Sequence, residues 1–273
     1  MYSALAADAL VFNSEYNQTT FFTGACGLFE NMPDGTPDSL LDQLPQLSQV
    51  IPVPISDDSA ADVVHKNRRN GRVEIVWNHR WEYDKQPQVF FAALAKLIEY
   101  GYEFAVHVMG QSFRDIPNCF TEFRRDHAEY VATWGHQPVD VYRQVLESAD
   151  IVVSAALHDF QGLGMLEAIA AGCIPVAPDR MAYPDYIPAE LLYMPDALAD
   201  QNITSQNKTS KNEEVRNSEV REVQALYQKL VQILEGEIKD TALSNSDISR
   251  YTCSEVMPNY QQLFTNLISS SSS

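Results

Sequence analysis

The sequence predicts an α/β protein built on a doubly wound parallel sheet, and two observations carry this prediction. Between residues 73 and 177, short apolar segments typical of buried strands alternate with segments that have helical spacing of apolar residues. The connections between successive strands are long enough to hold a helix, as crossovers between parallel strands require. We therefore expect a complete Rossmann-like domain over residues 73–200, with helices on both faces of its sheet.

The elements of this domain follow one another in regular order. Strands are expected at 73–79, 104–109, 131–135, 151–156 and 174–177, and helices at 87–100, 116–130, 139–148 and 164–171. Gly101 follows the first helix, where glycine commonly ends helices. Because the carboxyl ends of parallel strands share one edge of the sheet, the loops at that edge are the first place to search for a ligand site.

The flanking segments are less complete. Residues 5–13 are expected to form a strand, 15–29 a helix and 50–55 a short closing strand, which together are too little for an independent sheet. The other expected segments are a linker at 57–72, a flexible insertion at 201–219, C-terminal helices at 220–268 and a disordered tail at 269–273.

The composition excludes or disfavours several classes of protein. The formal net charge of −18 disfavours a general nucleic-acid binder, and 45% hydrophobic residues exclude a wholly disordered chain. No apolar run is long enough to cross a bilayer, and the apolar start lacks the basic residues of a signal peptide. Four cysteines without CxxC spacing favour reduced thiols in the cytoplasm, with the nucleus as the alternative compartment.

One segment opposes the acidic balance. The stretch HKNRRNGR at 65–72 contains four basic residues, Lys66, Arg68, Arg69 and Arg72. It is open to two interpretations, a solvated hinge loop or a local contact with RNA or another anion.

The loop after the strand at 73–79 reads NHRWEYDKQP and contains Arg80 and Lys85. An arginine fork and a lysine point charge at this edge of the sheet suit a diphosphate. The alternative is a pair of ordinary surface cations.

The loop after the strand at 151–156 reads LHDFQGLGMLEAIAAGCIP. Gly162 and Gly164 allow close approach of the backbone, and the free N–H groups of the helix that starts there favour phosphate oxygens. Asp159 and Glu167 could accept hydrogen bonds from ribose or sugar hydroxyls, although each alone could be a helix cap or a solvated residue. A GxGxxG motif is missing after the first strand, which disfavours a nicotinamide site.

These residues carry a resemblance. The segment HDFQGLGMLEAIAAGCIPV resembles the signature of retaining glycosyltransferases of the GT-B fold (family 4-like), in which an acidic residue lies eight positions before a glutamate, and the Arg80–Lys85 spacing fits the same enzymes. The segments NHRWEYDKQP, ADALVFNSEYNQTTFF and ADIVVSAALHDFQGLGMLEAIAAGCIPVAPDRMAYPDYIP further resemble the tRNA-queuosine α-mannosyltransferases. The resemblance extends over about residues 2–195.

The resemblance implies roles for individual residues. Asp159, Arg80 and Lys85 would be catalytic, with the two cations on the donor diphosphate. The other donor-binding residues would be Asn78, Gly110, His158, Phe160, Gln161, Gly162, Leu163 and Glu167, the last on the ribose. His158 is equally open to a structural role. Asp159 departs from the family, which usually has a longer glutamate there. Gly110, Gln111, Gly135 and His136 would border the nucleotide base.

The implied reaction is the transfer of mannose from GDP-mannose to queuosine in tRNA, with retention of configuration and without a metal ion. The implied partners are the nucleotide-sugar donor and tRNA. The short apolar runs predict no membrane partner. Residues 1–56 would be a remnant of an N-terminal Rossmann-like domain whose larger part is missing, so we expect impaired transfer. The alternatives are another nucleotide-sugar glycosyltransferase of the superfamily and a non-catalytic nucleotide-binding relative.

Overall fold

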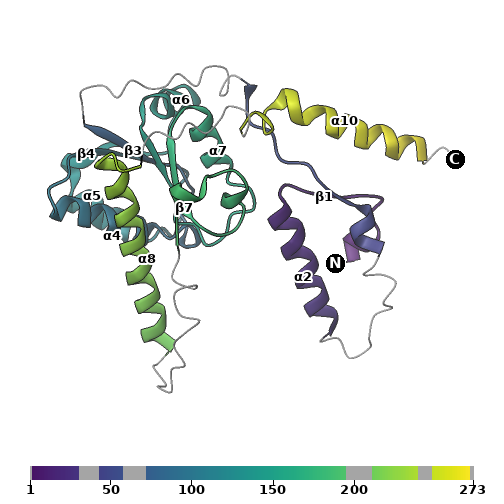
Figure 1. Cartoon of the computed structure of the whole chain (residues 1–273), viewed down its shortest axis with the longest axis horizontal. Coiled ribbons are helices and arrows are strands. Elements are labelled where there is room, and N and C mark those ends of the chain that lie inside the picture. Colours follow the sequence, from purple (N-terminus) through teal and green to yellow (C-terminus); the bar gives the residue numbers. More distant parts are fainter. Residues whose placement is uncertain (1, 31–42, 58–71, 195–210, 239–247, 271–273) are drawn as a thin grey trace.

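The computed structural model describes residues 2–30, 43–57, 72–194, 211–238 and 248–270. It has the predicted α/β architecture, in which a large parallel sheet covered by helices forms the central domain (Figure 1). A smaller unit that contains β1 and α2 lies to one side of this domain, and α10 extends over the same side (Figure 1).

The central sheet has six parallel strands in the order β5-β4-β3-β6-β7-β8. Their bounds are Val73–Trp77 for β3, Phe104–Met109 for β4, Val131–Gly135 for β5, Ile151–Val153 for β6, Ile174–Pro178 for β7 and Leu192–Tyr193 for β8. The strand order runs outward from β3 in one direction and from β6 in the other. The topological switch point, where such folds bind ligands, therefore lies between β3 and β6.

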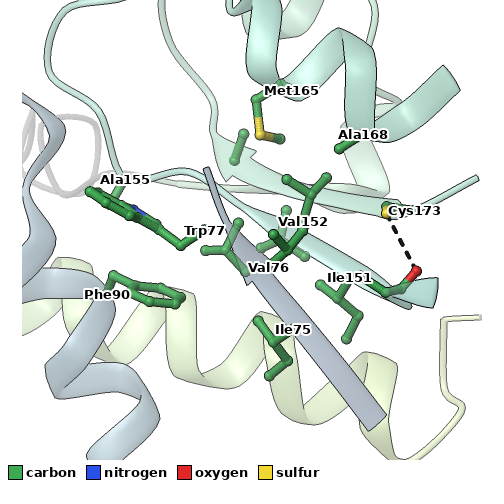
Figure 2. Close-up of a cluster of buried hydrophobic side chains, with 14 of the residues drawn as sticks. Ile75, Val76, Trp77, Phe90, Ile151, Val152, Ala155, Met165, Ala168 and Cys173 are labelled. Atoms are coloured by element: carbon green, nitrogen blue, oxygen red, sulfur yellow. Dashed lines mark hydrogen bonds between the residues drawn. The ribbon is translucent and has the colours of Figure 1, made fainter. Parts of the chain in front are cut away.

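Five helices of the described chain accompany this sheet: α4 (Pro87–Glu99), α5 (Cys119–Asp126), α6 (Val139–Ser148), α7 (Leu163–Ala170) and α8 (Lys211–Leu234). The core between helices and sheet is apolar and rich in aromatic residues. Trp77 of β3 stacks on Phe90 of α4 with ring centroids 6.0 Å apart, and both side chains are fully buried (Figure 2). The buried thiol of Cys173, directly before β7, donates to the carbonyl of Leu146 in α6 at 3.2 Å. All four cysteines are free thiols.

The predicted order of strands and helices is confirmed, but several predicted bounds are wrong. The helix expected at 116–130 is α5 followed by a separate 3-10 turn at Ala128–Tyr130. The strand expected at 151–156 ends at Val153, and directly after it the hydroxyls of Ser154 and Tyr183 share a hydrogen bond of 2.7 Å. α8 begins at Lys211, so residues 211–219 are helical and not part of the predicted insertion. Their polar composition resembles a loop, although Lys, Glu and Arg are good helix formers.

The N-terminal unit is built from one short β-α-β segment. β1 (Leu10–Phe12) pairs in parallel with β2 (Ser48–Val50), and α2 (Glu15–Glu30) connects them. The strand expected at 5–13 is thus shorter, since Tyr2–Leu5 forms the helical turn α1. Phe12 packs against Phe21 and Phe22 with centroids 5.2 and 5.7 Å away.

The C-terminal helix α10 (Cys253–Ser270) joins this small unit to the central domain. Ile55 forms a parallel bridge with Thr252 immediately before α10, and the hydroxyl of Tyr260 within α10 donates to the carbonyl of Ile51 at 3.3 Å. Serines 269 and 270, which were expected in the disordered tail, are the last residues of this helix.

Gln161 fastens the loop before α7 to the N-terminal unit. Its side chain is buried, its Oε1 accepts from the backbone N–H of Val53 at 2.8 Å, and its Nε2 donates to the carbonyl of Val53 at 2.8 Å. The Ser14 hydroxyl also donates to the carbonyl of Phe160. These contacts connect the end of β1 and the segment after β2 to the functional edge of the sheet.

The variant Gln161→Ala is expected to loosen this connection. It removes both hydrogen bonds that the buried Gln161 side chain makes to the backbone of Val53, which should lower the free energy of unfolding by about 2 kcal/mol. Urea unfolding and limited proteolysis check this. Gln137→Ala is the matched control, since the Gln137 amide donates to carbonyls two and three residues earlier, those of Gly135 and Trp134 at the end of β5, at 3.2 and 3.1 Å. Equal effects of both variants would contradict a special role for Gln161.

Several predictions fall outside the described residues. They concern Lys66, Arg68 and Arg69, the linker apart from Asp57 and Arg72, insertion residues 201–210 and tail residues 271–273. Arg72 itself lies 4.8 Å over the ring of Tyr130 and 3.7 Å from the carboxylate of Glu103. The proposed contact of this cluster with RNA stays a prediction. Among the described helices, none combines the length and apolar character needed to cross a membrane.

Candidate functional site

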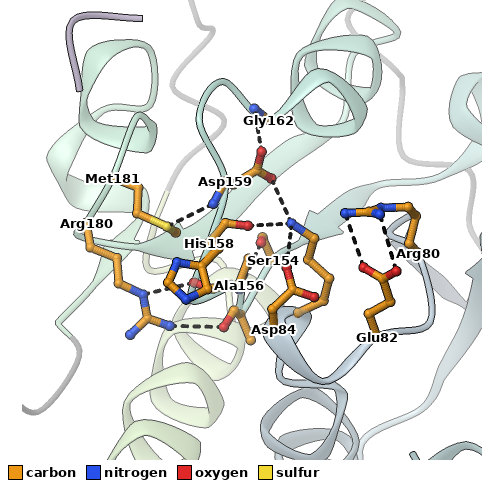
Figure 3. Close-up of polar contacts among 12 residues, drawn as sticks. Arg80, Glu82, Asp84, Ser154, Ala156, His158, Asp159, Gly162, Arg180 and Met181 are labelled. Carbon is orange, nitrogen blue, oxygen red and sulfur yellow. Dashed lines mark hydrogen bonds and ion pairs between the residues drawn. The ribbon is translucent and has the colours of Figure 1, made fainter. Parts of the chain in front are cut away.

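Two loops meet at the switch point of the sheet. The loop after β3 spans residues 78–86, and the loop after β6 spans residues 154–162. They are tied together by the backbone N–H of Leu157, which donates to the carbonyl of Asp84 at 2.7 Å. Both cations and the acidic residue predicted as catalytic lie on these loops, and Figure 3 shows their polar contacts.

Lys85 is the buried cation of this site. Its ammonium group donates to the carbonyl of His158 at 2.5 Å and lies 3.4 Å from the carboxylate of Asp84 and 3.9 Å from that of Asp159 (Figure 3). Only about 7% of the residue is exposed. The lysine therefore holds a positive charge at the meeting point of the two loops.

Arg80 lies further out and is largely exposed. Its guanidinium forms a two-pronged pair with Glu82, with N–O distances of 3.2 and 3.1 Å (Figure 3). This pairing is the geometry with which arginine also binds phosphate oxygens. Glu82 therefore occupies the face of Arg80 that a diphosphate would need.

Replacing Glu82 with glutamine is expected to release Arg80. An exposed ion pair of this kind contributes about 0–1 kcal/mol, so the variant should bind GDP roughly two- to fivefold more tightly. Calorimetric titration of both proteins checks the effect, and it should shrink as salt screens the charges. Unchanged affinity at low salt would mean that Glu82 does not compete with the ligand.

Asp159 organises the loop before α7. Its Oδ1 accepts from the backbone N–H of Gly162 at 2.9 Å and its Oδ2 accepts from the hydroxyl of Tyr183 at 3.1 Å. Gly162 has a φ of +77°, and a Cβ there would lie 2.4 Å from the hydroxyl oxygen of Tyr186, so only glycine fits. The carboxylate thus shapes the turn into α7, and its predicted contact with a sugar remains untested.

Glu167 lies within α7 and faces α6. Its Oε2 accepts from the hydroxyl of Tyr142 at 2.6 Å. Nδ2 of Asn78 donates to the same hydroxyl at 3.0 Å and to the carbonyl of Gly164 at 2.8 Å. Asn78, predicted to line the donor site, therefore has an amide nitrogen used in fastening β3 to α6 and α7.

Two histidines lie near the cations and differ in environment. His158 is exposed and contacts Lys85 through its main-chain carbonyl. His79 is buried, and burial lowers its pKa to about 4, against the raising influence of Asp159. His79 is therefore neutral at pH 7 and adds no positive charge to the site.

The remaining predicted residues lie around the same edge. Phe160 and Leu163 are exposed, and the side chain of Gln161 faces the N-terminal unit, so any contact of Gln161 with a donor would fall to its main chain. Gly110, with a φ of +145°, packs against the carbonyl of His79. Gly135 is the last residue of β5 and His136 follows it, two strands away from β3.

Sequence reasoning missed the supporting side chains. Tyr142, Tyr183 and Glu82 hold Glu167, Asp159 and Arg80 in turn. Arg180 ties the ends of β6 and β7 to α8 through the carbonyl of Ala156 at 2.9 Å and the buried carboxylate of Glu222 at 2.7 Å. Only the Arg80–Glu82 pair is close enough in sequence to have been predicted. Within the described ranges, His, Cys, Asp and Glu form no group of three suited to a metal ion.

Comparison with solved structures establishes the type of fold. The chain superposes on a glycosyltransferase from Rickettsia africae with a TM-score of 0.65 and 13% identity, over 97% of this chain and 64% of the other. It superposes on a sucrose-phosphate synthase from Thermosynechococcus elongatus with a TM-score of 0.63 and 17% identity, over 97% and 59%. These similarities establish the fold, which is that of the GT-B glycosyltransferases.

The family comparisons are more specific. Residues 1–55 match the family model described as tRNA-queuosine alpha-mannosyltransferase N-terminal, and residues 72–204 match Glycosyl transferases group 1. A tRNA-queuosine alpha-mannosyltransferase of Drosophila melanogaster is 32% identical over 203 residues, which are 70% of this chain and 52% of that protein. The resemblance to this glycosyltransferase family is thereby confirmed. The chain spans about half the length of the curated relative that it matches.

Proposed function

We propose that this chain binds GDP-mannose and takes part in the transfer of mannose to queuosine in tRNA, with retention of configuration. The observation that carries the proposal is the contact of Lys85 with the loop before α7 at the switch point of a GT-B-type sheet, with Arg80 on the same loop as Lys85. The match of residues 1–55 to the tRNA-queuosine alpha-mannosyltransferase model supports the acceptor assignment.

In this proposal, the chain promotes transfer by stabilising the negative charge that develops on the leaving GDP. Cleavage of the bond between mannose and the diphosphate leaves negative charge on GDP, and Arg80, Lys85 and the N–H groups at the start of α7 stabilise it. The carbonyl of His158 holds the Lys85 ammonium in place beside the carboxylates of Asp84 and Asp159. The two cations and the N–H groups supply the positive charge, so the reaction as proposed uses no metal ion. Glu167 accepts hydrogen bonds from the donor ribose, and Asp159 contacts the sugar.

Recognition of tRNA by so acidic a chain needs a local basic surface. We assign this role to Lys66, Arg68, Arg69 and Arg72, and place the enzyme in the cytoplasm, where tRNA and GDP-mannose are both present. The large negative charge elsewhere would then restrict tRNA to this one approach.

A second candidate function is nucleotide binding without transfer. One observation favours it: Asp159, already shorter than the family glutamate, has its carboxylate engaged by Gly162, Tyr183 and Lys85. Transfer of another sugar from another nucleotide is the third candidate.

The transfer reaction tests these candidates directly. The purified chain is incubated with radiolabelled GDP-mannose and queuosine-containing tRNA, and label on the tRNA is measured. The expected result is weak labelling of the tRNA, because the chain spans about half of its curated relative, and this labelling requires Arg80. The control acceptor is tRNA lacking queuosine. Binding of GDP-mannose without transfer would favour the second candidate, and transfer from UDP-glucose in place of GDP-mannose would favour the third.

A further inference from the structure

The hydroxyl of Tyr142 lies between two residues of the candidate donor site. It donates to Oε2 of Glu167 at 2.6 Å and accepts from Nδ2 of Asn78 at 3.0 Å. Since Tyr142 is on α6, Glu167 on α7 and Asn78 directly after β3, this chain of hydrogen bonds joins three elements that meet at the switch point.

The geometry around Asn78 fixes the donor direction of this chain. Its Nδ2 also donates to the carbonyl of Gly164 at 2.8 Å, and a Cβ at Gly164 would lie 3.1 Å from that nitrogen. With both protons of the amide nitrogen used, the tyrosine hydroxyl can only direct its own proton at the glutamate.

The protonation state agrees with this assignment. Burial, together with the nearby carboxylate of Glu167, raises the pKa of Tyr142 well above its ordinary value. The hydroxyl thus remains a donor throughout the physiological pH range. A short bond from a neutral hydroxyl to a carboxylate is a strong hydrogen bond and selects one conformation of the glutamate side chain.

We propose that Tyr142 is a positioning residue that holds the carboxylate of Glu167 ready for the hydroxyls of the donor ribose. The inference rests on the proposed function, because Glu167 matters to binding only if a ribonucleotide occupies the site. It adds that the carboxylate of Glu167 is already in place to accept hydrogen bonds from the ribose. A nucleotide that lacks the 2′ and 3′ hydroxyls cannot form these bonds.

The test compares two ligands on two proteins. Calorimetry measures GDP and 2′,3′-dideoxy-GDP binding to the wild-type chain and to Tyr142→Phe. We expect the variant to bind GDP about tenfold more weakly, because Glu167 loses the hydrogen bond that holds its carboxylate in the binding conformation. Binding of the dideoxy ligand should change less than twofold, because it makes no bond to Glu167. In the Glu167→Ala background, Tyr142→Phe should have no further effect.

Tyr102→Phe is the matched control, since its hydroxyl likewise donates to a carboxylate, that of Glu235 directly after α8, at 2.5 Å. It should bind both ligands as the wild type does. An equal loss for GDP and dideoxy-GDP in Tyr142→Phe would overturn the inference and leave the proposed function standing. A wild-type chain that binds neither GDP nor UDP would overturn both.

Discussion

Replacing Lys85 with methionine is expected to weaken the binding of GDP by about 100-fold or more. Methionine keeps the apolar stem and removes the buried positive charge at the meeting point of the two loops, where low exposure makes a contact between this charge and a phosphate strong. The dissociation constants of GDP for the two proteins, measured by calorimetry, give the effect.

The same substitution should also destabilise the fold. Without the ammonium group, the carboxylates of Asp84 and Asp159 lose the cation that lies 3.4 and 3.9 Å away. Lys229→Met is the matched control, because Lys229 likewise donates to a backbone carbonyl, that of Glu190 at 2.6 Å, but lies away from the site. Unaltered affinity for GDP in a folded Lys85→Met protein would refute the diphosphate role of Lys85.

The second large effect is expected from Gly110→Ala. A Cβ at this position would lie 1.9 Å from the carbonyl oxygen of His79, a backbone atom that cannot move without displacing the loop that holds Arg80 and Lys85. We expect a loss of about 3 kcal/mol or more in the free energy of unfolding, together with weaker GDP binding. Urea unfolding and calorimetry measure the two quantities.

Gly135→Ala separates this close contact from simple backbone strain. Gly135 also has a positive φ, +86°, at the end of β5, but a Cβ there would have no neighbour within 4 Å. The control variant should lose only about 1–2 kcal/mol, the cost of a left-handed conformation for a side-chain-bearing residue. If both variants lose the same stability, the close contact between Gly110 and the carbonyl of His79 is not the cause of the loss.

The sheet and the two functional loops could be predicted because their signals are local. Apolar runs mark β3 to β7, and the residues that follow β3 and β6 are adjacent to those runs in sequence. Parallel strands present their carboxyl ends at one edge of the sheet, and β3 and β6 are neighbours, so the two loops lie together.

The supporting contacts could not be predicted, because they join distant parts of the chain. Tyr142 lies 25 residues from Glu167, and Tyr183 lies 24 residues from Asp159, with no periodic pattern linking either pair. Gln161 shows the same limit. Its amide suits a ligand or a backbone equally well, and only the fold reveals that it bonds Val53, 108 residues away. The start of α8 at Lys211 could not be predicted, because the polar residues of its first turns show no apolar periodicity.

Binding of GDP to the purified chain, with and without Arg80→Ala, is the most direct measurement of the central claim that the edge between β3 and β6 holds a nucleoside diphosphate. The predicted result is saturable binding that the substitution weakens and that added salt reduces, as expected for a phosphate contact. Binding that is indifferent to Arg80→Ala, or no binding of GDP or UDP at all, would contradict it.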